Sequence, residues 1–168
     1  LSWKVTYTSG SSTPTVATPT FSPGTGNYLT TQNVTITTAT EGATIRYTTN
    51  GDEPTETSTE YTSPIDVSST TTIKAKAFKV GMDASAVASA TYSFPVQVAN
   101  IAGFLATSET GNVAISGSVT VVYQKGLNLY VKDASGTLLV YGSTGKTFVN
   151  GDQLTGLMGI RGEYGLSP

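Results

Sequence analysis

The 168-residue chain contains neither histidine nor cysteine, and this double absence removes most common kinds of active site. Without these residues there is no Ser-His or Cys-His nucleophile pair, no ordinary zinc site and no disulfide bond. Only carboxylate chemistry, lysine chemistry or oxygen-ligated metals remain open. We therefore expect a protein that is not an enzyme and that uses no cofactor.

Charge is also scarce in this chain. Only 12% of the residues are charged, and the formal net charge is −2. A balance so close to neutral gives no global field that would attract nucleic acid or anionic lipid. No apolar run reaches the length of about 18 residues that a membrane-spanning helix needs. No signal peptide is visible at Leu1, so we expect a mature or excised fragment.

Threonine, glycine and proline are plentiful instead. Threonine is the most frequent residue, and 18 glycines and 7 prolines supply turns. Threonine is β-branched and suits a half-solvated pleated surface, whereas no window shows the pattern of a substantial amphipathic helix. The composition therefore predicts an all-β fold.

Alternation of apolar and polar residues predicts strands in the first half of the chain, at residues 33–38, 43–49, 63–67, 70–79 and 85–94. In the fourth of these, Ile73, Ala75 and Ala77 share one face, and Lys79 extends it. Asn50-Gly51 suits a tight turn with positive φ at both residues. Several such strands without helices predict an antiparallel β-sandwich. Residues 1–8 alternate as well and form either the last strand of a preceding domain or a strand that docks on the sandwich.

Residues 45–92 contain the stretches IRYTTNGDEPT, EYTSPIDVSSTTTIKAKAF and ASAVASATYSF. These stretches resemble the small domain named after the C-terminal region of chitobiase and β-hexosaminidase. The resemblance implies a sandwich of the immunoglobulin or fibronectin type III kind, found as an accessory in secreted bacterial proteins that handle glycans. That family is not catalytic, so the resemblance transfers no active-site residue.

The pattern changes at Pro95. A long strand at 112–124 with Gly117 in its middle, a hairpin at 127–142 and a strand at 152–164 resemble an OB-fold barrel. Only four of the five strands of such a barrel can be counted, so the barrel is either reduced or completed beyond Pro168. We therefore predict three regions: a strand and linker at 1–12, the sandwich at 13–95 and the OB-like barrel at 96–168.

Residues Gly142–Thr147 read GSTGKT and look at first like a phosphate-binding loop. The first glycine of such a loop would fall at position 140, which is Val140, and a helix should come next where the sequence has FVNGDQLTG. We therefore predict a turn between strands and no nucleotide site.

Charged residues form two groups in the first half of the chain. The acidic group cannot be matched to a calcium loop, so a calcium site is the less favoured interpretation, and we expect Asp52 to accept hydrogen bonds from turn amides. The basic group is expected to pair with these acids or to protect an edge strand. The acids are Asp52, Glu53, Glu56 and Glu60, and the bases are Arg46, Lys74, Lys76 and Lys79.

Aromatic residues give the best binding candidates. Alternation in LNLYVKD places Leu127, Leu129 and Val131 inward, and Asn128, Tyr130 and Lys132 outward. In OB-folds the second and third strands form the ligand-binding face, and aromatic rings there stack on bases or sugars. The predicted ligand-binding residues are Tyr130, Lys132, Tyr141, Lys125 and Tyr123. The alternative is that solvent-facing tyrosine and lysine simply suit β-strands.

These observations lead to one expected function and two alternatives. We expect non-catalytic accessory or binding modules of a secreted or cell-surface bacterial protein, with a glycan or a protein surface as partner beside neighbouring domains of the same polypeptide. Residues 96–168 hold equal numbers of acids and bases, which disfavours nucleic acid. The alternatives are binding of single-stranded nucleic acid beside a nuclease, and a purely structural spacer.

Overall fold

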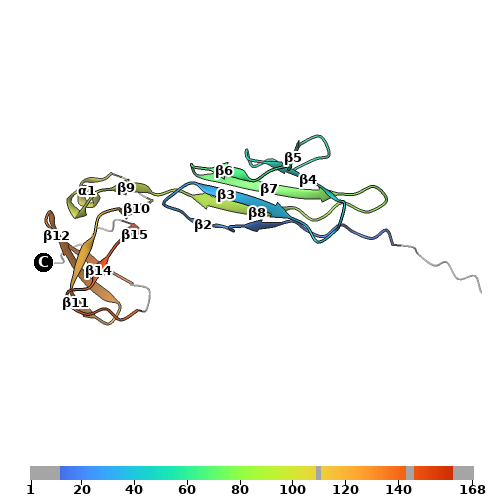
Figure 1. The fold of residues 1–168 in the computed structure, drawn as a ribbon. Coiled ribbons are helices and arrows are strands. Elements are labelled where there is room, and N and C mark those ends of the chain that lie inside the picture. Colours follow the sequence, from blue (N-terminus) through green and yellow to red (C-terminus); the bar gives the residue numbers. More distant parts are fainter. Residues whose placement is uncertain (1–11, 109–110, 143–145, 161–168) are drawn as a thin grey trace, which may run out of the picture. The chain divides into compact units, whose positions relative to one another are not determined.

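The computed structural model describes residues 12–108, 111–142 and 146–160 (Figure 1). The strand predicted at residues 1–8 and the end of the strand predicted at 152–164 lie outside the described residues. The described part is almost entirely β-structure, with one short helix, so the all-β prediction is confirmed. The described part contains no helix that is long and apolar enough to span a bilayer.

The chain divides into two compact units. The first contains residues up to Gly26 together with Thr31–Ser93, and the second contains Asn27–Thr30 together with the residues from Phe94 onward. Each unit is described by itself, and the two-residue strand at Gly26–Asn27, which straddles this division, is described with the first. Separate folding of the predicted regions 13–95 and 96–168 stays a prediction.

The first unit is a sandwich of two sheets. One sheet has the strand order β1-β3-β6 and the other β2-β8-β7-β4-β5. The bounds are β1 Thr20–Ser22, β2 Gly26–Asn27, β3 Gln32–Thr37, β4 Thr44–Thr48, β5 Thr59–Glu60, β6 Ile65–Val67, β7 Thr71–Phe78 and β8 Ala88–Ser93. The pairs β1–β3, β3–β6, β4–β5, β4–β7 and β7–β8 are antiparallel.

The core of the first unit follows the predicted alternation. Ile73, Ala75 and Ala77 of β7 are fully buried, as is Val34 of β3. Burying one face of a strand in this way fixes its register, because a slip by one residue would expose the whole apolar set. Lys79 was expected to extend this face but lies beyond the end of β7, where its side chain is exposed and donates a hydrogen bond to the carbonyl of Glu41.

The predicted tight turn at Asn50-Gly51 is wrong in its type. β4 pairs with β5, which begins only at Thr59, so the connection is a long loop and not a two-residue hairpin. Of the two residues Asn50 and Gly51, only Gly51 has a positive φ, of 88°. The side-chain oxygen of Asn50 instead accepts a hydrogen bond from the backbone N–H of Asp52 at 3.1 Å. Asp52 was expected to accept from turn amides, and the residue that does so is Asn50.

The second unit contains two small sheets and one helix. The strand orders are β15-β10-β9 and β13-β12-β11-β14, and β9 runs parallel to β10. The bounds are β9 Val96–Val98, α1 Ile101–Ala106, β10 Asn112–Ile115, β11 Val119–Lys125, β12 Asn128–Asp133, β13 Gly136–Val140, β14 Gln153–Leu154 and β15 Leu157–Ile160. Neither sheet closes into a barrel among the described strands, and the OB-fold is not confirmed.

One core fills the second unit. It combines Ile101 and Phe104 of α1 with apolar side chains of both sheets, namely Val113, Ile115, Val119, Val121, Leu129 and Val131. The helix was not predicted from the sequence, because six residues with two buried side chains carry too little periodicity. The strand predicted at 152–164 is also interrupted, since β14 and β15 are separated by Gly156 with φ of 68°.

Gly117 divides the long predicted strand at 112–124 between the two sheets. β10 precedes it in one sheet and β11 follows it in the other. The N–H of Gly117 donates to the carbonyl of Ala99 at 3.1 Å, and a Cβ at position 117 would collide with that same oxygen. The predicted bend at Gly117 is therefore present, and close backbone approach explains why it is glycine.

Candidate ligand-binding face of the second unit

A β-bulge in β11 determines which way Tyr123 points. Val119 and Val121 are buried, so regular alternation would bury Tyr123 as well. The register with β12 shifts between Val121 and Tyr123, which places an extra residue, Val122, on β11. Val122 and Tyr123 consequently both face solvent, with exposed fractions of 38% and 56%.

The bulge brings two of the predicted site residues into contact. Tyr123 lies opposite Tyr130 in the β11–β12 ladder. Their ring centroids are 5.9 Å apart, and the ring planes are inclined by 39°. Tilted aromatic pairs at this separation attract one another, so the two rings support each other at the surface. Tyr130 opposes Leu139 of β13 on its other side.

We call the outward side of β11, β12 and β13 the tyrosine face. Tyr141 directly follows β13 and is 49% exposed, two residues after Leu139. The tyrosine face comprises Val122, Tyr123, Lys125, Tyr130, Lys132, Leu139 and Tyr141.

The two predicted lysines lie on either side of the tyrosine pair. Lys125 is two residues beyond Tyr123 and opposes Asn128, whereas Lys132 is two residues beyond Tyr130 and opposes Thr120. Two residues along a strand correspond to about 7 Å, so each lysine backbone lies about that far from the tyrosine row, in opposite directions. Both side chains are exposed, and neither has an ion-pair or hydrogen-bond partner among the described residues.

Asp133 is an acid of β12 that points away from this face. Its carboxylate accepts hydrogen bonds from the N–H groups of Ile101, Ser135 and Gly136 and from the Ser135 hydroxyl, at 2.6–3.1 Å. Desolvation raises the pKa of Asp133, but these hydrogen bonds outweigh it and hold the pKa below its ordinary value. The carboxylate therefore links the β12–β13 turn to the start of α1.

One expectation for β12 is wrong. Leu127 was predicted to point inward, but it lies in the turn between β11 and β12 and is 59% exposed. The turn forms at Gly126, whose φ is 60°, and the ladder resumes only at Asn128. The inward placement of Leu129 and Val131 is confirmed, since both are buried.

The predicted turn at Gly142–Thr147 falls partly outside the described residues, since 143–145 are among those left out. Gly142 has a φ of 67°, and residues 146–149 form no helix. The side chain of Gln124 holds this segment by donating to the carbonyl of Lys146 and accepting from the N–H of Phe148.

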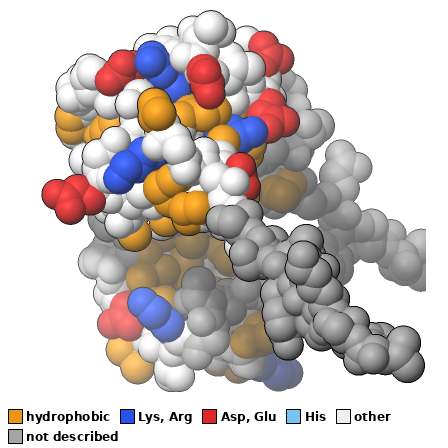
Figure 2. All heavy atoms as spheres, turned by 90° about the vertical axis from the view of Figure 1, so that its right-hand side faces the viewer, with side chains coloured by type: hydrophobic (Ala, Val, Ile, Leu, Met, Phe, Trp, Pro, Cys, Tyr) orange, Lys and Arg blue, Asp and Glu red, His pale blue; other side chains and the backbone are white. Residues whose placement is uncertain are grey.

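The basic group of the first unit is paired with acids in part: two of its four residues form the predicted ion pairs. Lys76 forms an ion pair with Glu53 at 3.0 Å, and Arg46 forms one with Glu60 at 3.3 Å. The other two residues of the basic group, Lys74 and Lys79, donate to backbone carbonyls. On the face shown in Figure 2, basic and acidic side chains are interspersed and form no patch of one sign.

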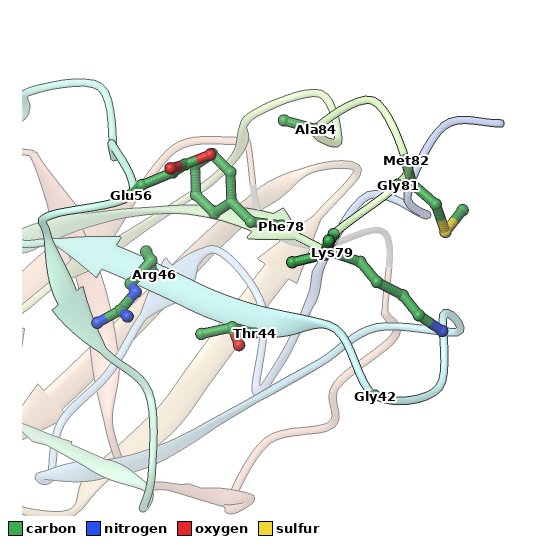
Figure 3. A pocket seen from close by; sticks show the side chains of 10 residues that line it. Gly42, Thr44, Arg46, Glu56, Phe78, Lys79, Gly81, Met82 and Ala84 are labelled. Carbon is green, nitrogen blue, oxygen red and sulfur yellow. The ribbon is translucent and has the colours of Figure 1, made fainter. Parts of the chain in front are cut away.

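An open depression lies on the first unit beside β4 and the end of β7. Figure 3 shows Thr44 and Arg46 coming from β4, Phe78 from β7, and Glu56 from the loop that precedes β5. Arg46 is already engaged with Glu60 and with the carbonyl of Ser58. The depression therefore offers one half-buried aromatic ring, and no residue of the predicted ligand site lies in it.

Comparison with known proteins gives one informative result. Searches of curated proteins and of solved structures found no match to the chain. Residues 23–91, which run from just before β2 into β8, match the family described as "Chitobiase/beta-hexosaminidase C-terminal domain". The resemblance stated for residues 45–92 is thereby confirmed, and the family that this part of the first unit resembles is one of non-catalytic, carbohydrate-associated accessory domains.

Proposed function

We propose that this chain is a non-catalytic, glycan-binding accessory region of a secreted or cell-surface bacterial protein, and that the tyrosine face holds the glycan. The observation that carries the proposal is the outward Tyr123–Tyr130 pair on an antiparallel three-stranded ladder. The match of the first unit to a carbohydrate-associated family supports the same class of ligand.

Sugar rings and tyrosine side chains complement each other chemically. A pyranose presents a face of C–H groups that packs on an aromatic ring, while its hydroxyl groups need hydrogen-bond partners at the rim. The tyrosine face provides both, because the rings of Tyr123 and Tyr130 are flanked by the ammonium groups of Lys125 and Lys132 and by the amide of Asn128. The two tyrosines would stack on the sugars, and the flanking groups would donate hydrogen bonds.

The first unit serves in this proposal as an accessory scaffold. Among its described residues, the four basic side chains are occupied by acids or by backbone carbonyls, and hydroxyl pairs such as Thr72–Thr91 at 2.9 Å link neighbouring strands. Basic side chains that already have partners leave few groups for a ligand.

The test is binding of the whole chain to a panel of soluble polysaccharides, measured by affinity electrophoresis and calorimetry. Tyr130→Ala should weaken binding at least about fivefold, since an aromatic stacking contact contributes roughly 1–3 kcal/mol. Ile160→Ala is the matched control, because Ile160 is a large, 64% exposed side chain of the same unit that lies on the other sheet. Equal loss in both variants, or no polysaccharide binding at all, would contradict the proposal.

A further inference from the structure

The charge on the tyrosine face is of one sign among the described residues. Lys125 and Lys132 are exposed there and have no ion-pair or hydrogen-bond partner in the part of the unit that the structure describes. The described acids of the second unit are Asp133 and Asp152, and the carboxylates of both accept hydrogen bonds from backbone N–H groups. Asp133 binds the start of α1, and Asp152 accepts a hydrogen bond from the N–H of Val149 at 2.9 Å. A chain with a net charge of −2 thus presents a cationic face around its tyrosine pair.

The spacing of these groups follows the strand direction. Lys125 opposes Asn128 at one end of the ladder, Tyr123 opposes Tyr130 in the middle, and Thr120 opposes Lys132 at the other end. Four steps along β12 separate the two lysine rows, which is about 13 Å at the rise of a strand. A linear ligand lying along the strands would meet a cation, an aromatic pair and a second cation in succession.

We propose that the ligand of the tyrosine face is an anionic glycan, a polysaccharide that carries carboxylate groups on its sugar rings. This inference rests on the proposed function and specifies its substrate class. The sugar rings stack on Tyr123 and Tyr130, and carboxylates on either side pair with Lys125 and Lys132. Because both pairs are exposed to solvent, their contribution is screened by salt.

Single-stranded nucleic acid is also anionic, but it fits the face less well. A nucleic-acid groove neutralises many phosphates, whereas two lysines would release few counterions and leave affinity low. Successive bases stack on parallel platforms, and the two tyrosine rings are in contact and inclined by 39°. Oligo(dT) is therefore a competitor in the test and not the proposed ligand.

The experiment compares polygalacturonate and alginate with their methyl esters, which keep the sugar rings and remove the charge. The whole chain should bind the acidic forms about fivefold to tenfold more tightly than the esters at low salt, as two exposed ion pairs allow. This preference should shrink as salt is raised. The double variant Lys125→Gln with Lys132→Gln should bring acid and ester to equal affinity, while Lys79→Gln of the first unit should leave the preference intact.

The outcomes separate this inference from the proposed function. Tyr130-dependent binding that is equal for acid and ester, or that is confined to neutral glycans, overturns the anionic ligand and leaves glycan binding in place. Absence of any Tyr130-dependent binding to polysaccharide overturns both. Tighter binding of oligo(dT) than of every acidic polysaccharide, lost in the double lysine variant, would assign the face to nucleic acid.

Discussion

Position 117 is a glycine because the structure leaves no room there for a side chain. Its α-carbon faces the carbonyl of Ala99, so a methyl group at position 117 would force the β9–α1 connection away from the start of β11. We expect Gly117→Ala to lower the free energy of unfolding of the second unit by about 1–3 kcal/mol, the usual cost of overpacking. Urea denaturation followed by circular dichroism measures this change.

The matched control at this position is Gly159→Ala. Gly159 lies in β15 of the same unit, and a Cβ there would meet nothing within 4 Å. The free energy of unfolding of the Gly159→Ala variant should differ from that of the wild type by no more than about 0.5 kcal/mol. A loss of equal size in the two variants would show that close approach to Ala99 is not what requires glycine at position 117.

Tyr123 and Tyr130 should matter more for binding than for folding. Both are exposed, and their mutual contact is worth about 0.5–1.5 kcal/mol. We therefore expect Tyr130→Ala to reduce the free energy of unfolding by no more than that amount, and a double-mutant cycle with Tyr123→Ala to isolate the coupling. A loss of several kcal/mol would mean that the tyrosine face is part of the core and not a surface prepared for a ligand.

At the level of elements, α1 depends on three side chains that cap its first turn. Asn100 accepts from the N–H of Gly103, Asp133 from that of Ile101, and Ser135 from that of Ala102, at 2.8–2.9 Å. A six-residue helix has few internal hydrogen bonds, so these caps satisfy N–H groups that would otherwise lack partners. The β12–β13 turn and α1 are thereby joined into one structural element.

The cap by Asp133 predicts a pH dependence. The pKa of Asp133 is lowered in the folded state, so its stabilising effect is fully present above the unfolded pKa of about 4 and is lost as the pH falls through the lower folded value. Asp133→Asn should reduce the free energy of unfolding by about 1 kcal/mol at pH 7, and the difference from the wild type should vanish in acid. Thermal melting at a series of pH values measures it.

Asp83→Asn provides the control for this titration. Asp83 is exposed in the first unit, and only its backbone takes part in hydrogen bonds among the described residues. Its replacement should leave the melting temperature unchanged at every pH. A difference between Asp133→Asn and wild type that stays constant down to low pH would show that the carboxylate's charge is not responsible.

Elements with a regular alternation were predictable from the sequence, whereas short or irregular ones were not. β3, β4, β7 and β8 each bury one face, and the alternation of Leu129, Tyr130 and Val131 on β12 was correct. β1, β2, β5 and β9 have only two or three residues, which is too few to show a period. Tyr123 points outward because of a bulge in β11. A bulge inserts one residue and so reverses the inward–outward alternation on which prediction of strand faces from sequence depends.

At the scale of the whole molecule, the long-range pairing of strands was the least predictable feature. The sandwich was predictable because its strands alternate regularly and because residues 45–92 resemble a known family. The OB-like barrel was predicted from strand order and from the bend at Gly117, but these do not specify which strands pair. In the described residues β10 pairs with β9 and β15, while β11 pairs with β12 and β14, and the sheets stay separate.

Two compact units with separate cores should unfold as two cooperative transitions. We expect calorimetry of the whole chain to show two transitions, and Gly117→Ala and Asp133→Asn to lower the temperature of the same one. Ala75→Gly should lower the other, since Ala75 is fully buried in the first unit. A single transition that moves as a whole with all three variants would show that the units do not unfold separately.

Mapping of the ligand by NMR decides whether the tyrosine face of the second unit binds an acidic glycan. Acidic oligosaccharide would be titrated into the isotope-labelled whole chain while the backbone amide signals are followed. We predict saturable shifts centred on Tyr123, Tyr130 and Lys132, with little change in the depression beside Phe78. Shifts centred in the first unit, or no saturable shift with any glycan of the panel, would contradict binding at the tyrosine face.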